Sequence, residues 1–268
     1  MSDALLIERD GRVLILTMHR PEVKNALNPE MLCRLADAWD VANADDEVRC
    51  VILTGAGGDF CAGADLDKLV ARSIANLPPE DEFEARCREN PDTIFRGLLR
   101  SVRLAKPLIA AIEGYCVAGG TEILQATDIR VAGEGAVFGI TEVKWGLFPQ
   151  GGSTVRLRRQ IPYTMAMELL LTGDTFPAAD ALRFGLIGRI VAKGGALAAA
   201  REIAARVSAN GPVAVRKVKQ SVQETEALPE REALDLEFKI GMEVYATEDA
   251  REGPRAFKEK RAPQFKGR

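Results

Sequence analysis

The spacing of hydrophobic residues changes along this chain, from short runs in the first part to helical spacing in the last. Short apolar runs predict strands at residues 4–9, 12–18, 49–54, 108–114 and 128–133. Asp10-Gly11 separates the first two, which predicts a β-hairpin. A helix is predicted to begin after Asn28, a good N-cap residue, with Pro29 at its first position.

From Gly151 onward the pattern is helical. Helices are predicted at residues 152–160, 162–171, 178–184, 194–208, 212–225, 230–246 and 248–259. Strands and helices therefore alternate in the first two-thirds of the chain, while the last third is helical. This order predicts an α/β core over residues 1–194 and a C-terminal helical module for trimerisation or capping over residues 195–268.

One internal segment lacks regular hydrophobic spacing. Residues 72–92 are rich in charges and contain three prolines, which predicts a mobile loop or lid ordered mainly by ligand. A helix over residues 93–104 is predicted to follow it.

Composition narrows the classes of function. Charged residues make up 28% of the chain, the formal net charge is −3 and the pI is about 5.5, which argues against a nucleic-acid partner. No apolar run approaches the roughly 20 residues that span a bilayer, and Met1 to Asp10 does not resemble a signal peptide. Five scattered cysteines predict no disulfide framework and favour a reducing cytoplasm. A single histidine, His19, and the absence of a calcium-loop pattern predict no metal site.

Two segments place small residues where a strand ends and a helix begins: CAGADL at 61–66 and VAGGTE at 117–122. The first N–H groups of a helix lack partners, and small residues let a ligand oxygen approach them. Two such sites together could form an oxyanion hole from backbone alone. The alternative is a pair of tight turns that need small residues only for geometry. A phosphate loop is excluded because no G-K-S/T follows.

Glu122 and Glu142 are the candidate acid/base residues. Glu122 falls in the first turn of the predicted helix after Gly120, among small and apolar neighbours, and a buried carboxylate is costly unless it has a role. Glu142 follows a short predicted strand. Each could instead be an ordinary glutamate at the start of a helix. The residues alone do not show that the two side chains meet.

Several long motifs resemble the enoyl-CoA hydratase/isomerase (crotonase) family. They are HRPEVKNALN, GGDFCAGADL, PLIAAIEGYCVAGGTEILQATDIRVAGEGAVFGITEVKWGLFPQGGS, LLLTGDTFPAADALRFGLI and EGPRAFKEKRAPQF. The resemblance covers nearly the whole chain. It implies an α/β fold of the crotonase-type ββα superhelix (ClpP/crotonase-like) with a C-terminal helical module, assembled as a homotrimer or a dimer of trimers.

The resemblance also implies residue roles and a reaction. Glu122 and Glu142 match the two hydratase glutamates, with the family's spacing of 20 residues, and Ala64 and Gly119 match the oxyanion-hole positions. The matched positions for coenzyme A and substrate are Ala62, Asp65 and Leu66 along the CoA approach, Lys24 and Ala26 at the adenosine end, and Phe257 and Lys260, which often reach nucleotide across a subunit boundary. The implied reaction is the reversible addition of water to trans-2-enoyl-CoA thioesters in fatty-acid or sterol side-chain β-oxidation. Coenzyme A is then part of the substrate, and no separate cofactor is needed.

The sequence departs from the family pattern at two places. Pro149 is followed by Gln150-Gly151-Gly152, one residue shorter than the common P-G-A-G-G, and the segment 70–95 is long. WGLFP and RQIPYT resemble a bacterial branch that includes hydratases of sterol-derived acyl-CoAs. Other readings stay open: a carnitinyl-CoA-type dehydratase, an enoyl-CoA isomerase, or an acyl-CoA-binding subunit without catalysis.

Overall fold

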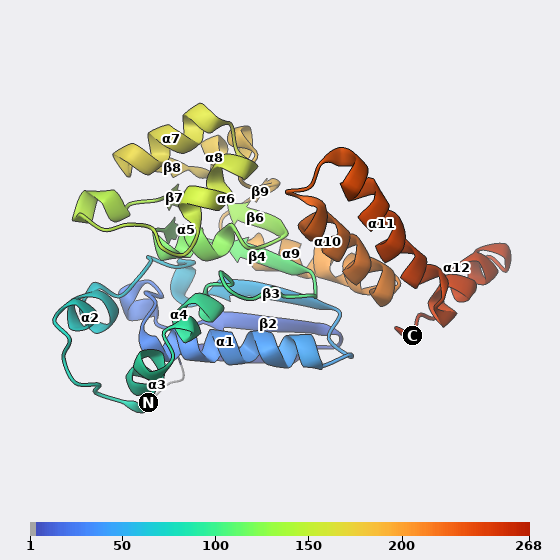
Figure 1. Ribbon diagram of the computed structural model, residues 1–268, viewed down its shortest axis with the longest axis horizontal. Helices are drawn as coiled ribbons and strands as arrows, with labels where there is room; N and C mark the ends of the chain where they lie inside the picture. The colour runs from blue at the N-terminus through green and yellow to red at the C-terminus, as the bar shows by residue number, and fades with distance from the viewer. Residues whose placement is uncertain (1–3) are drawn as a thin grey trace.

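A six-stranded sheet forms the centre of the computed structural model, which describes residues 4–268 (Figure 1). The strand order is β1-β2-β3-β4-β6-β9, and all pairings except β1 with β2 are parallel. The strands are β1 (Leu5–Asp10), β2 (Val13–Met18), β3 (Cys50–Gly55), β4 (Leu108–Ile112), β6 (Ile129–Gly133) and β9 (Arg189–Val191). A smaller sheet joins β5 (Tyr115–Val117), β7 (Val137–Gly139) and β8 (Thr175–Pro177).

Helices cover both faces of the large sheet. On one face lie α1 (Pro29–Ala44) and α4 (Asp92–Gly97); on the other lies α9 (Ala196–Ser208). Strands β3 and β4 are buried along almost their whole length, as expected for parallel strands covered on both sides. The other α-helices are α2 (Arg72–Ile74), α3 (Glu82–Glu89), α5 (Gly119–Leu124), α6 (Ser153–Gln160), α7 (Tyr163–Thr172), α8 (Ala178–Phe184), α10 (Pro212–Thr225), α11 (Glu230–Tyr245) and α12 (Glu248–Lys258).

The predicted hairpin, the helix after Asn28 and the strands predicted at 49–54, 108–114 and 128–133 are confirmed; these strands are β3, β4 and β6. Asn28 Oδ1 accepts the N–H of Met31 at 2.9 Å, so it caps α1 as predicted. The strands β5, β8 and β9 were not predicted, because runs of three residues are too short to show a period of two.

The predicted loop over 72–92 is wrong in part, because this segment contains helices α2 and α3. Asp81 caps α3 by accepting the N–H of Glu84, and Arg72 and Arg88 both pair with the Glu84 carboxylate. Charges that look like a solvated loop in the sequence therefore hold the segment together. Arg72 and Glu84 are 12 positions apart and Arg88 and Glu84 are four apart, and hydrophobic spacing shows neither pairing.

The helix predicted over 93–104 is also wrong in extent, because α4 ends at Gly97. A Cβ at Gly97 would lie 2.6 Å from the carbonyl oxygen of Leu32, so only glycine allows α4 to approach α1 this closely. Leu99 then takes a positive φ of 53°, which ends the helix.

The C-terminal helices differ in what they pack against. Helix α9 packs directly on the large sheet and fills its second core cluster with Ala196, Ala200 and Ile203. Helices α10 and α11 pack against each other, and α12 lies at the right of Figure 1, away from α2 and α5. The boundary between residues 194 and 195 remains a prediction. Within residues 4–268, no helix has the length and apolar character to cross a membrane.

Candidate active site

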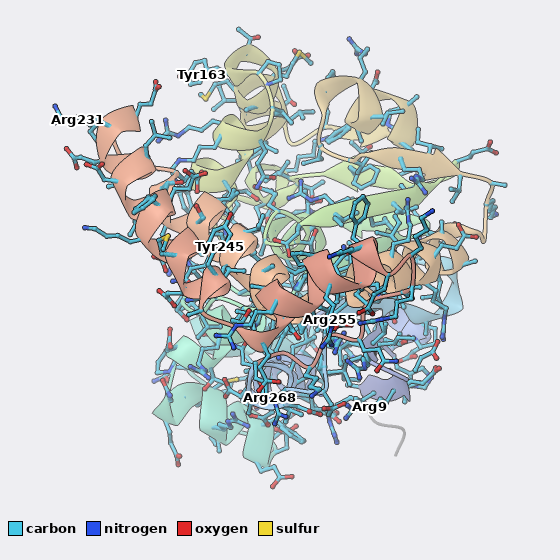
Figure 2. All side chains as sticks on the ribbon, turned by 90° about the vertical axis from the view of Figure 1, so that its right-hand side faces the viewer. Arg9, Tyr163, Arg231, Tyr245, Arg255 and Arg268 are labelled. Carbon is cyan, nitrogen blue, oxygen red and sulfur yellow. The ribbon has the colours of Figure 1, made fainter. Side chains whose placement is uncertain are left out.

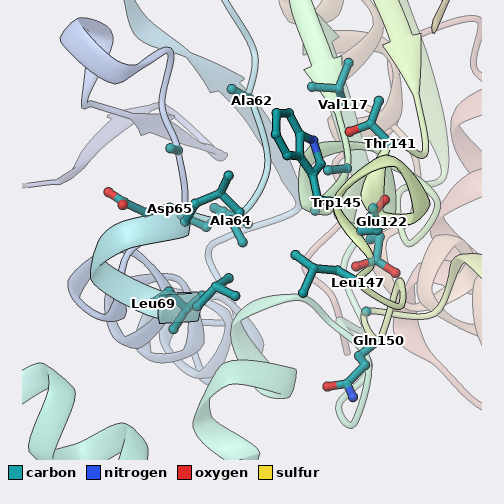
Figure 3. A pocket seen from close by; sticks show the side chains of 18 of the residues that line it. Ala62, Ala64, Asp65, Leu69, Val117, Glu122, Thr141, Trp145, Leu147 and Gln150 are labelled. Carbon is teal, nitrogen blue, oxygen red and sulfur yellow. The ribbon is translucent and has the colours of Figure 1, made fainter. Parts of the chain in front are cut away.

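A cavity of about 1000 Å³ is lined by residues of α4, β5 and α5 and of the segments 62–74 and 141–151. In Figure 3, Ala64, Asp65 and Leu69 form one wall, and Glu122, Leu147 and Gln150 face them. The lining is mostly apolar, and Glu122 and Glu142 both reach it. Apolar side chains that line it include Leu32, Leu69, Val70, Ile74, Ile94, Phe95, Leu98, Val117, Trp145, Leu147 and Phe148.

Glu122 is held at the start of α5 by the turn that follows β5. Ala118 adopts a positive φ of 48°, and the Thr121 hydroxyl donates to the carbonyls of Cys116 or Gly139 at 2.6 and 2.9 Å. The Ser153 N–H donates to Glu122 Oε1 at 3.2 Å. The Ser153 N–H thus holds the carboxylate, while the turn before α5 positions the backbone of Glu122. Glu122 is only 4% exposed, so its side chain is largely shielded from water.

Glu142 begins η4 (Glu142–Trp145), a short 3-10 helix directly after β7. It is 9% exposed, and within residues 4–268 its Oε2 atom has no hydrogen-bond partner. Burial, followed by the negative charge of Glu122, raises the pKa of Glu142 from 4.5 to about 7. A buried carboxyl group of this kind favours its neutral, protonated form.

The pKa of Glu122 is also raised by burial, but several groups act in the opposite direction. The backbone N–H groups of Ser153, Gly151 and Gly152 stabilise its carboxylate, and so does the positive charge of Arg156. The two carboxyl groups thus differ in surroundings: backbone donors approach Glu122, whereas Glu142 Oε2 has no hydrogen-bond partner among residues 4–268 and lies within the influence of the Glu122 charge. Such a difference separates an acid from a base.

The backbone amides of Ala64 and Gly119 lie close together in the cavity lining. Gly119 is the first residue of α5, so its N–H has no carbonyl partner within that helix. A Cβ placed on Gly119 would lie 3.5 Å from the Ala64 nitrogen, which shows how close the two amides are. Gly63 makes this approach possible: its φ is +96°, and a Cβ there would lie 2.6 Å from the Ala118 Cβ.

Of the other predicted binding residues, Ala26, Ala62, Asp65 and Leu66 line the cavity. Asp65 has a structural role as well, because it pairs with Arg20 at 2.9 Å and caps η3 (Leu66–Ala71), a π-helical turn.

The remaining three residues lie outside the cavity lining. Lys24 Nζ sits 3.7 Å from the centroid of the Tyr115 ring, which itself borders the cavity. Phe257, in α12, is 87% exposed, and Lys260 follows the same helix. Their predicted contact with nucleotide across a subunit boundary remains a prediction.

Sequence reasoning missed the residues behind Glu122. Gly151, Ser153 and Arg156 follow Pro149, where the sequence shows only a glycine pair before a helix. Gln125 Nε2 donates to Ser153 Oγ at 2.8 Å, which fixes the loop that meets the carboxylate. The shortened P-Q-G-G stretch therefore still supplies backbone donors, and they bind Glu122. Within residues 4–268 no group of three or more histidine, cysteine or acidic side chains could hold a metal ion.

The fold and this cavity define a crotonase-type protein: two buried carboxyl groups and two neighbouring backbone amides line one cavity. Residues 8–268 match the enoyl-CoA hydratase/isomerase family, and the chain belongs to that family. The curated enoyl-CoA hydratase EchA19 of Mycobacterium tuberculosis is 54% identical over 263 residues, covering 98% of this chain and 96% of the relative.

Two further relatives mark the breadth of the family. The crystal structure of enoyl-CoA hydratase EchA1 from Mycobacterium marinum superposes with a TM-score of 0.89 at 40% identity, covering 100% of both chains. The carnitinyl-CoA dehydratase of Salmonella typhi is 35% identical over 274 residues, again covering 100% of both. The predictions of the family, the crotonase fold and an enoyl-CoA hydratase are confirmed at this level.

Proposed function

We propose that this enoyl-CoA hydratase adds water across the C2=C3 bond of trans-2-enoyl-CoA, with Glu122 as base and Glu142 as acid. The observation that carries the assignment is the contrast between the two carboxyl groups. Three backbone N–H groups stabilise the Glu122 carboxylate, while burial keeps Glu142 protonated up to about pH 7.

The thioester oxygen would accept hydrogen bonds from the N–H groups of Ala64 and Gly119. Glu122 takes a proton from a water molecule as its oxygen bonds to C3. The π electrons of C2=C3 move toward the thioester carbonyl, and the two amides stabilise the negative charge that develops there. Glu142 then gives its proton to C2. The product is the 3-hydroxyacyl thioester, and the reverse sequence removes water.

The presence of both carboxyl groups in one cavity favours hydration over isomerisation. An isomerase moves one proton between C2 and C4, which a single carboxylate accomplishes. Water addition needs a base for the water and an acid for C2, and both are here. Water supplies every atom that is added, so coenzyme A, as part of the substrate, is the only carrier that the reaction needs. The five free cysteines fit a reducing cytoplasm.

The activity test is the loss of absorbance of the conjugated enoyl thioester. Part of the cavity of about 1000 Å³ is assigned to coenzyme A, but the rest of its lining is apolar and includes Ile74, Ile94 and Phe95, so we favour a bulky apolar acyl group, such as a sterol side chain with its rings, as the substrate. Crotonyl-CoA, a long-chain enoyl-CoA and a steroid-side-chain enoyl-CoA should be compared by kcat/KM. No turnover of any of them would contradict the proposed function, whereas preference for crotonyl-CoA would contradict only the acyl-group assignment.

The pH dependence of kcat/KM follows from the two carboxyl groups. We expect kcat/KM to fall as pH rises through about 7, because Glu142 then loses the proton destined for C2. On the acid side kcat/KM should fall as Glu122 becomes protonated. The profile at low substrate concentration measures both limbs, and a kcat/KM that kept rising above pH 8 would contradict these roles.

Protein stability gives an independent check on Glu142. Folding raises its pKa from 4.5 to about 7, so its favourable contribution is present below pH 4.5 and lost as pH rises through 7. The melting temperature of Glu142→Gln should therefore rise relative to that of the wild type as the pH is raised from 5 to 8. A difference between the two proteins that stays constant over this range would argue against the raised pKa.

Assembly as a homotrimer or a dimer of trimers is the second part of the proposal. Figure 2 shows the face of the C-terminal helices, with Tyr245 exposed on α11. Ile240 is buried against the chain, but Leu234, Phe238 and Met242 are 55%, 67% and 50% exposed at intervals of four residues. An apolar stripe of this kind is typical of a contact between copies.

We expect light scattering at micromolar concentration to give the mass of three or six chains. Phe238→Glu should shift the mass toward that of one chain, because it places a charge in the stripe. Lys239→Glu, one position along the same helix, is the matched control and should leave the assembly intact. An active wild-type enzyme with the mass of one chain would refute the proposal.

A further inference from the structure

Cysteines 33 and 87 meet between helices α1 and α3. Their Sγ atoms are 3.7 Å apart although the residues are 54 positions apart in the sequence. Cys33 is fully buried and Cys87 is 6% exposed. Neither side chain lines the catalytic cavity, so the proposed reaction gives no reason for the contact.

Helix α3 connects two walls of the cavity. Before it in the chain come η3 and α2, which contribute Leu69 and Ile74, and after it comes α4, which contributes Phe95. The helix is short and polar, and its hold on α1 includes exposed contacts: the Arg86 guanidinium bonds both Asp37 oxygens at 2.6 and 2.8 Å. Surface segments with few buried apolar contacts open more readily than the core.

We infer that Cys33 and Cys87 are a reversible disulfide site through which peroxide ties α3, and with it the cavity wall, to α1. The sulfur atoms would approach from 3.7 Å to about 2.05 Å, a short movement for a surface helix. Cys50, Cys61 and Cys116 are as fully buried as Cys33, but burial raises the pKa of Cys50 and Cys61 to about 12 and that of Cys116 well above its usual value, whereas the contact with Cys87 lowers the pKa of Cys33. Those three should stay thiols, because thiolates are the reactive species.

The oxidation balances with one hydrogen peroxide. The Cys33 thiolate, whose pKa is lowered by its contact with the Cys87 thiol, attacks one peroxide oxygen; an S–O bond forms, the O–O bond breaks and water leaves with a proton. Cys87 sulfur then attacks Cys33 sulfur, the S–S bond forms, and the sulfenic oxygen leaves as water with the Cys87 proton. Two thiols lose two electrons, and the peroxide is reduced to two water molecules.

Peroxide treatment of the reduced, full-length protein tests the site. After treatment, alkylation in denaturant should label three of the five cysteines instead of all five, and dithiothreitol should restore five. Peptide mapping without reductant should find Cys33 linked to Cys87. Trypsin should cut the native protein at Arg86 and Arg88 at least severalfold more slowly after oxidation, because the linked helix opens less often.

Cys87→Ala is the matched variant; it should form no disulfide after peroxide and should keep its trypsin sensitivity. Alkylation of both Cys33 and Cys87 in the treated wild type would overturn the inference, and so would a disulfide that contains Cys61 or Cys116. The wild-type peptide map decides the question even if the variant folds poorly. Neither readout depends on hydratase activity, so a failure here would leave the proposed function untouched.

Discussion

Glu122→Gln and Glu142→Gln are each expected to lower kcat by at least about a hundredfold while KM stays within a few-fold. General acid–base groups typically contribute about 10²–10⁴ in rate. The amide keeps the size of the side chain but neither takes a proton from water nor gives one to C2. In the proposed binding mode backbone N–H groups and apolar contacts hold the thioester, so its binding should survive. Steady-state kinetics on a good enoyl-CoA measure both constants.

The double variant, Glu122→Gln with Glu142→Gln, tests whether the two carboxyl groups act in the same reaction. It should be little slower than the poorer single variant, because the loss of either group already prevents the reaction, and members of one catalytic unit are not additive. An isomerase would give a different result, in which one of the two variants keeps most of its activity. Hydration by Glu122→Gln at nearly the wild-type rate would disprove the two-carboxylate mechanism.

Gly151→Ala should be nearly as damaging without changing any titratable group. A Cβ at position 151 would lie 2.6 Å from Glu122 Oε2 and 2.8 Å from its Cδ, so the carboxylate must move. Misplacement of a catalytic group by about 1 Å can cost on the order of 10²-fold in rate. We expect a fall in kcat of about that size, with KM changed little.

Gly135→Ala is the matched control, because nothing lies within 4 Å of its added Cβ and its φ is not positive. It should retain wild-type kinetics, and both variants should keep the wild-type far-ultraviolet circular dichroism. If Gly151→Ala kept full activity, the close packing of this loop against Glu122 would have no catalytic role.

The sequence predicts the fold where local pattern and packing agree. Helix α1 has its cap, its proline and an apolar face within one segment, and β3 and β4 are continuous apolar runs. The segment 72–92 fails this test, because the partners of its charges are distant in the sequence. Arg86 pairs with Asp37, 49 positions away, and Arg72 pairs with Glu84 across the segment itself, and hydrophobic spacing shows neither partner.

The candidate site shows the same limit. Motifs identify Glu122, Glu142, Ala64 and Gly119, but only three-dimensional packing brings residue 64 beside residue 119. Likewise, the position of Glu142 near an apolar strand gives no sign that its Oε2 lacks a partner, and that isolation sets its proposed role as an acid. Packing between distant segments determines the difference between the two carboxyl groups.

The two converging amides make the proposed oxyanion hole tolerant of mutation in a way that the carboxyl groups are not. A codon change at position 64 replaces a side chain, yet the donor remains, because it belongs to the peptide bond; at position 119 a Cβ would lie 3.5 Å from the Ala64 nitrogen and 3.1 Å from Leu27 Cδ1, so glycine is needed there. Proline alone removes the N–H directly. Natural variation can therefore reshape the surroundings of the thioester, and with them the accepted acyl group, while charge stabilisation at the carbonyl is inherited unchanged with the backbone.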